Sequence, residues 1–195
     1  MNKINSFAAF LILTIFLFVA CTNEKKLDEK KYSEEFRGYA KEYLMGLKSV
    51  LMKNMHESGP VKAITVCSDT ASDLTKMYSE VMKIEVKRVS LKNRNADNFP
   101  DSFEKESISE FEKLLSENKL NDKSEIIKIV SENEQEFIRY VKPIIIEAPC
   151  LNCHGSDSEI TPEVKSIIKK NYPNDKAVDY KIGDLRGVVS ITKTL

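Results

Sequence analysis

The segment 136–155 reads EFIRYVKPIIIEAPCLNCHG and joins an expected β-strand to the most distinctive motif of the chain. Its first part, 136–147, is rich in β-branched and aromatic residues, which favour a strand. Pro143 cannot donate a backbone hydrogen bond to a neighbouring strand, so it predicts an edge position or a bulge. Pro149 before the motif and Gly155 after it indicate a tight local turn.

Helical and strand patterns follow one another through the rest of the chain. Ser58-Gly59-Pro60 ends a first amphipathic pattern, and proline is favoured in the first turn of the helix expected after it. Alternation of apolar and polar residues marks the strands. The expected elements are helices at 32–57, 60–78, 103–117, 123–132 and 161–170, a loop at 92–102, and strands at 84–91 and in a terminal hairpin at 179–193 around Gly183–Gly187. This order predicts an α+β fold.

The motif Cys150-Leu151-Asn152-Cys153-His154 is the attachment signature of c-type haem. Two cysteines three positions apart on a helical turn lie on one side of the backbone, where each thiol can add to one haem vinyl group. The adjacent His154 would bind the iron through a neutral imidazole nitrogen. The sequence therefore predicts one covalently bound haem c.

Three other interpretations of the two cysteines are weaker. A thioredoxin-like redox pair usually opens a helix after a buried strand in a βαβ pattern. A zinc site needs a second pair of ligands, and the remaining Cys67 and His56 lack the usual close spacing. A disulfide between the two cysteines would close a strained loop.

The balance of charge argues against one class of partner. Lys plus Arg and Asp plus Glu each number 30 among the 195 residues, so the formal net charge is zero. Neutralising nucleic-acid phosphates needs a basic excess or a basic patch, so we expect no nucleic-acid partner. A hydrophobic content of 42% is ordinary for a globular protein.

The first residues resemble the signal peptide of a bacterial lipoprotein. Lys3 is followed by the apolar run 7–20, whose fourteen residues suit a signal peptide and fall short of the roughly 20 needed to span a bilayer. Phe18-Val19-Ala20-Cys21 resembles a lipobox, in which the cysteine becomes the lipidated first residue. Phe18 stands where the lipobox usually has leucine.

We therefore divide the chain into a signal peptide at 1–20, a charged tether at 21–31 and one domain at 32–195. The protein is expected to be exported and held at a membrane of the cell envelope by lipid on Cys21, facing the periplasm. Haem is attached to c-type proteins outside the cytoplasmic membrane, so export agrees with the motif.

Cys67 is the one cysteine among four that neither lipid nor haem accounts for. It lies on the apolar stripe of the second helix, where a buried core thiol is one interpretation and a second axial haem ligand is the other. Other candidates for that ligand are His56, expected to be an exposed or capping residue, and methionines that are more typical of core filling: Met45, Met52, Met55, Met77 and Met82.

Three separated motifs resemble the PAS-like family of c-type haem-binding domains, long catalogued as a domain of unknown function and found in bacterial sensor kinases and stand-alone exported proteins. Ala63-Ile64-Thr65-Val66-Cys67, Leu91-Lys92-Asn93-Arg94-Asn95 and Gly183–Gly187 match them in order, and the resemblance covers residues 35–195. One departure is Ala96, where the family often has proline, which would make this loop less rigid.

The resemblance implies a PAS-like antiparallel sheet with long N-terminal helices packed on it and haem on the helical side. It also implies Cys67 as the distal axial ligand opposite His154, and a thiolate ligand would favour ferric iron and a low reduction potential. Arg94 and Arg186 are expected to pair with the haem propionates, because guanidinium suits carboxylates. The alternative for both is a surface arginine in a loop.

Two functions fit these features. One is a redox or gas sensor in which displacement of Cys67 lets a diatomic gas bind, and the other is a simple electron-transfer cytochrome. A peroxidase-like enzyme is not expected, because His56 is the only other histidine. No output domain is recognised in the sequence, so a sensor would need a separate signalling protein. An electron carrier would need a redox partner.

Overall fold

The computed structural model of the protein describes residues 29–195. The predicted signal peptide and the lipidation of Cys21 lie outside the described residues. The predicted tether also lies outside them, except for its last three residues, Glu29–Lys31, which begin helix α1. Within the described part, no helix combines the length and apolar character needed to cross a bilayer.

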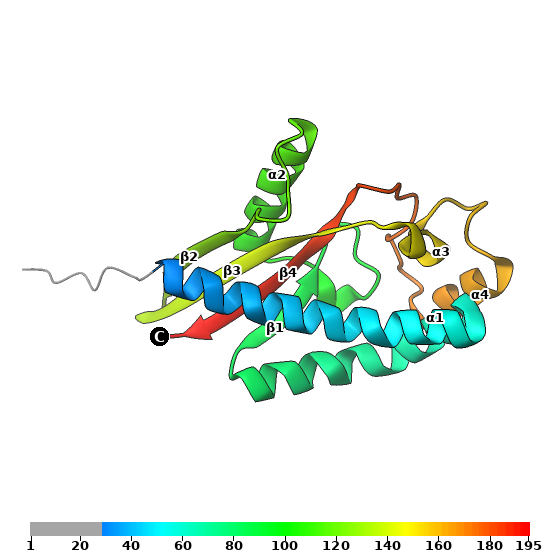
Figure 1. The fold of residues 1–195 in the computed structure, drawn as a ribbon, viewed down its shortest axis with the longest axis horizontal. Helices are drawn as coiled ribbons and strands as arrows, with labels where there is room; N and C mark the ends of the chain where they lie inside the picture. Colours follow the sequence, from blue (N-terminus) through cyan, green and yellow to red (C-terminus); the bar gives the residue numbers. More distant parts are fainter. Residues whose placement is uncertain (1–28) are drawn as a thin grey trace, which may run out of the picture.

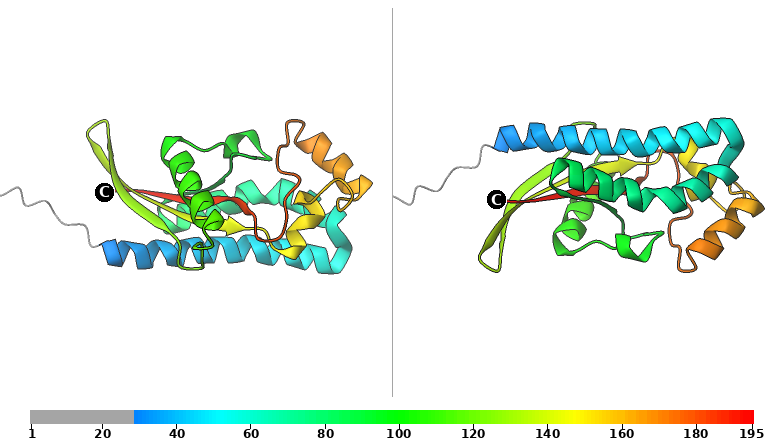
Figure 2. Two further views of the ribbon diagram at one scale, coloured as in Figure 1. Left: turned by 90° about the horizontal axis from the view of Figure 1, so that it is seen from above. Right: turned by 90° about the horizontal axis from the view of Figure 1, so that it is seen from below.

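Helix α1 (Glu29–Met82) consists of two halves that fold back on each other. The break is at Gly59, whose φ of 76° and ψ of −178° are not helical, and Pro60 follows it. The hydroxyls of Tyr43 and Thr75 hydrogen-bond between the two halves at 2.8 Å. Figures 1 and 2 show the halves running side by side. The prediction of two helices separated at 58–60 is therefore confirmed.

Four strands form one antiparallel sheet in the order β1-β4-β3-β2. The predicted strands at 84–91 and 136–147 are confirmed as β1 and β3. The bounds are β1 (Glu85–Val89), β2 (Ile126–Glu132), β3 (Gln135–Ile145) and β4 (Leu185–Thr194).

The sheet has helices on both faces. Phe36 and Tyr43 of α1 pack against Tyr140 and Ile191 on one face. Helix α2 (Ser102–Ser116) covers the other face. The remaining helical elements are η1 (Ala96–Asn98), η2 (Ala148–Cys150), α3 (Leu151–His154) and α4 (Pro162–Asn171). The predicted α+β class, with long N-terminal helices on an antiparallel sheet, is confirmed.

Pro143 has the edge position that the sequence predicts. Strand β2 pairs with β3 only as far as Val141, so at Pro143 the strand has β4 on one side and no strand on the other. The register then shifts, because Ile144 pairs with Gly187 but Ile145 pairs with Leu185. Arg186 is left as the extra residue of a bulge, a feature that redirects side chains.

Glycine is required at position 187, next to this bulge. Gly187 has a φ of 151°, and a Cβ there would lie 2.2 Å from the carbonyl oxygen of Val89. Any side chain would therefore push β1 away from β4. The close approach of the two strands brings Arg88 and Arg186 into the wall of the same cavity.

A buried ionic network fastens α2 to the sheet. Glu104 is fully buried, and its Oε1 lies 3.1 Å from Lys87 Nζ and 3.3 Å from Arg139 Nη2. Its Oε2 accepts a hydrogen bond from the backbone N–H of Asp101, whose side chain caps the helix in return. The Glu104 carboxylate thus caps the start of α2 and is also the counter-ion of Lys87 on β1 and Arg139 on β3.

The helix predicted at 123–132 is wrong, because this segment contains strand β2. Asn133 and Glu134 both have positive φ, at 51° and 65°. They form the two-residue connection of a hairpin, for which such a backbone is favoured. Pairing with β3 along its whole length overrides the weak helical pattern of the segment.

The terminal hairpin predicted at 179–193 is also wrong. Only the second half forms a strand, β4, which pairs with β1 and β3. In the first half, the N–H groups of Asp179 and Tyr180 donate to the carbonyls of Gly155 and His154. These donors cap the end of α3 and are not free for a strand.

Candidate functional site

The cysteine motif forms a helical turn at the end of β3. Elements η2 and α3 carry it, and the N–H of Gly155 donates to the carbonyl of Leu151 at 3.0 Å. A Cβ at Gly155 would lie 2.7 Å from that same carbonyl oxygen, so this turn requires glycine. Cys150, Cys153 and His154 all line one cavity, as the spacing of the motif predicts.

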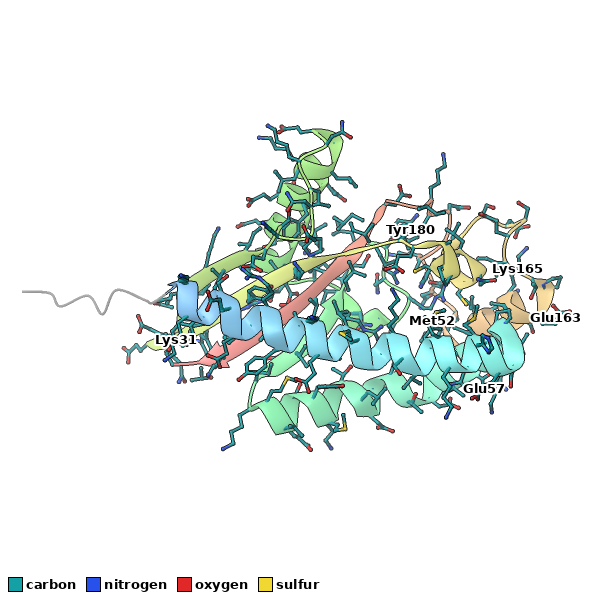
Figure 3. The ribbon with its side chains drawn as sticks, viewed as in Figure 1. Lys31, Met52, Glu57, Glu163, Lys165 and Tyr180 are labelled. Carbon is teal, nitrogen blue, oxygen red and sulfur yellow. The ribbon has the colours of Figure 1, made fainter. Side chains whose placement is uncertain are left out.

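The cavity has a volume of about 530 Å³, within the ~300–1,000 Å³ of ligand and cofactor sites. Both halves of α1, the sheet and α3 form its walls. Met52, which lines the cavity, and Tyr180 lie at the end of the molecule that carries α3. Lys31, at the start of α1, lies at the opposite end (Figure 3). The apolar lining of the cavity comes largely from α1 and includes Leu44, Leu47, Leu51, Ile64 and Ala71. The cationic residues of the cavity are Lys48, Arg88, Arg94 and Arg186.

His154 has the geometry of a metal ligand. Its Nδ1 lies 2.7 Å from the carbonyl oxygen of Ala177, which can only accept, so Nδ1 carries the proton and Nε2 keeps a free lone pair. Histidines that bind metals usually donate their other N–H to such a carbonyl. Burial, assisted by Arg186 and Arg94, holds the pKa of His154 well below its usual value. The ring is therefore neutral.

The three described cysteines are free thiols, so the disulfide interpretation of the motif is not supported. Burial raises the pKa of Cys153, although nearby Arg94 acts in the opposite direction. Within residues 29–195 no group of three or more His, Cys, Asp or Glu side chains could hold a metal ion. The zinc interpretation therefore lacks its second pair of ligands in this part of the chain.

Cys67 lies in the wall of the same cavity as His154. It is half-buried, and one turn before it Ile64 packs against Val164 and Ile168 of α4, which holds this part of α1 near α3. Burial raises the pKa of Cys67, and nearby Arg88 lowers it. The structure thus brings Cys67 to the predicted haem site, while its role as a ligand stays a prediction.

The other candidates for the second axial ligand differ in their exposure and in whether they line the cavity. His56 is exposed, as predicted, and does not line the cavity. Met45, Met77 and Met52 were expected in the core but are 60%, 45% and 38% exposed. Met52 and Met55 do line the cavity. Among the candidates, only Cys67 and these two methionines line the same cavity as His154.

Arg94 and Arg186 both line the cavity, but their contacts differ. Arg94 Nη2 lies 3.2 Å from Asp175 Oδ2 and donates to the carbonyls of Cys153 and Ala177. Arg186 lies over the Tyr180 ring and donates one hydrogen bond, of 3.2 Å, to the carbonyl of Lys92. Their predicted pairing with propionates stays a prediction.

Sequence reasoning missed Arg88, Ala177 and Tyr180. Tyr180 packs edge-on against the His154 ring, with 6.2 Å between ring centroids. Ala177 acts through its backbone carbonyl, which leaves no trace in the sequence. Arg88 could have been found, because strand alternation places it on the face of buried Val86, and a charged residue on an apolar face is a signal of function.

Comparison with known proteins agrees with this architecture. The crystal structure of the cyanobacterial heme-protein Tll0287 is similar, with a TM-score of 0.58 and 23% sequence identity over 88% of this chain and 96% of that one. At this identity the similarity concerns the fold. A search of curated proteins gave no match. The family model described as Tll0287-like matches residues 23–193, and the protein therefore belongs to the Tll0287-like family.

Proposed function

We propose that the protein binds one haem covalently through Cys150 and Cys153, with His154 and Cys67 as axial ligands, and acts as a redox or gas sensor of the cell envelope. The observation that carries this proposal is the convergence of these four side chains on one cavity. Membership of the Tll0287-like family supports it, since the similar structure is that of a heme-protein.

The residues present fit a haem. The two thiols lie on one helical turn, and each would add its S–H bond across one vinyl double bond, sulfur to one carbon and hydrogen to the other, with nothing released. His154 offers Nε2, because Nδ1 is bound to Ala177. Leucine and isoleucine side chains in the cavity wall provide an apolar environment. A bound haem would supply one-electron chemistry and an iron coordination position.

Cys67 is the residue through which such a site would signal. It belongs to the second half of α1, which follows the break at Gly59. Loss of a contact between Cys67 and the cofactor would let the part of this half around Cys67 shift in the cavity wall. The proposed signal is therefore a change in the position of the second half of α1, passed to a separate signalling protein.

We further propose that the protein is an exported lipoprotein anchored through Cys21 and facing the periplasm. The start of α1 and the C-terminus lie at one end of the molecule, and α3 lies at the other (Figure 1). Met52, in the cavity wall, is about 35 Å along the helix from Glu29. Anchoring at the N-terminal end would thus hold the cavity away from the membrane, within reach of a water-soluble partner.

Carbon monoxide added to the reduced holoprotein tests the sensor. We expect it to bind by replacing Cys67, with a change in the absorption spectrum, and to bind faster in a Cys67→Ala variant, because no ligand has to leave. If the wild-type spectrum stays unchanged under carbon monoxide and nitric oxide while the protein exchanges electrons rapidly with small redox proteins, it is an electron-transfer cytochrome.

A further inference from the structure

Three arginines from different elements line the cavity. Arg88 comes from β1, Arg94 from the loop after β1, and Arg186 from the bulge of β4. All three line the same cavity as His154. The proposed axial histidine therefore lies in a region of concentrated positive charge.

Carboxylates of the chain compensate only part of this charge. Among the described residues, Asp175 pairs with Arg94 at 3.2 Å, and Glu147 pairs with Lys48 at 2.6 Å. Within residues 29–195, neither the Arg88 nor the Arg186 side chain has an ion-pair partner, and the Arg88 side chain has no hydrogen-bond partner either, although its backbone pairs with Val189 of β4. Two positive charges in the cavity wall are thus left without an anion, which is costly at a partly buried site.

Arg94 differs from the other two because its hydrogen bonds are internal. It donates at 3.2 Å to the Ala177 carbonyl, which also accepts from His154 Nδ1 at 2.7 Å, and it donates to the carbonyl of Cys153. These contacts hold the loop of Ala177 against α3. Arg94 is therefore a positioning residue for His154, and it is already neutralised by Asp175.

We propose that Arg88, together with Arg186, forms a site for the two carboxylates of a porphyrin ligand, and that Arg88 binds one of them directly. Two uncompensated guanidinium groups match two carboxylates, and guanidinium–carboxylate pairs are among the strongest hydrogen-bonded contacts in proteins. This inference rests on the proposed haem function and adds a residue that the family motifs do not contain.

The test compares two porphyrins on the full chain purified without haem: ferric protoporphyrin IX and its dimethyl ester, whose carboxylates are blocked. We expect the wild type to bind the dicarboxylate at least about tenfold more tightly than the ester, as charge-assisted hydrogen bonds predict. Arg88→Gln should remove most of this preference by weakening dicarboxylate binding, and Arg88→Lys should retain part of it.

Lys128→Gln is the matched control, because it removes the same charge from an exposed position on β2 beside Arg139. It should keep the full preference, and thermal unfolding of all variants checks that they fold. Equal binding of both porphyrins by the wild type would refute the carboxylate site and leave the haem function standing. A full preference in Arg88→Gln would refute the role of Arg88. Failure of both porphyrins to bind would overturn the haem function together with this inference.

Discussion

Replacing Cys150 and Cys153 together with alanine is expected to remove all covalently attached haem from the purified protein. Both thiols line the cavity beside His154, and thioether bonds to them are the only covalent link that the proposal contains. Without them, haem would be held by coordination and packing alone and would be lost on denaturation. Haem staining of a denaturing gel and the intact mass of the chain measure this directly.

Cys67→Ala is the matched control for this experiment. It removes a thiol from the wall of the same cavity, but one that has no role in attachment, so the haem should remain on the denatured chain. Covalent haem in the Cys150→Ala/Cys153→Ala protein would contradict the proposed attachment.

Glu104→Ala is expected to cause the largest loss of stability among single substitutions of charged residues, about 3–5 kcal/mol. The change leaves Arg139, whose side chain is only 10% exposed, and Lys87 with the partly exposed Asp101 as their remaining shared counter-ion. It also removes the carboxylate that accepts from the Asp101 N–H at the start of α2. Urea unfolding followed by circular dichroism gives the free energy of unfolding.

Glu106→Ala provides the comparison, since Glu106 is an exposed residue of the same helix. Its loss should change the free energy of unfolding by less than about 0.5 kcal/mol. Similar values for the two variants would show that the buried network contributes little to the stability of the fold.

The sequence predicts the frame of the fold where strong local signals exist. Gly59-Pro60 marks the break in α1, and Pro143 lies just beyond the end of the pairing between β3 and β2. Strand β2 was missed because its Lys and Glu residues resemble a helix surface and only pairing with β3 makes it a strand. The failure at 179–184 has a related cause, since this segment caps α3.

The sequence predicts the residues proposed to bind the haem, but not all of the groups that surround them. The cysteine motif and Cys67 can be read from residue types and from family resemblance, and the structure brings them to one cavity. The Ala177 carbonyl that orients His154 could not be predicted, because a backbone group has no sequence signature. The roles of the arginines depend on which carboxylates lie near them, and Asp175 is far from Arg94 in the sequence.

The central claim is a haem held between His154 and Cys67, and one comparison tests it most directly. Absorption and electron paramagnetic resonance spectra of the holoprotein should be recorded for the wild type, Cys67→Ala and Met55→Leu. We expect the ferric wild type to show a low-spin histidine–thiolate signature that is lost in Cys67→Ala and kept in Met55→Leu. Unchanged ferric and ferrous spectra in Cys67→Ala would contradict the account, because the thiol would then be a residue of the cavity wall and not a ligand.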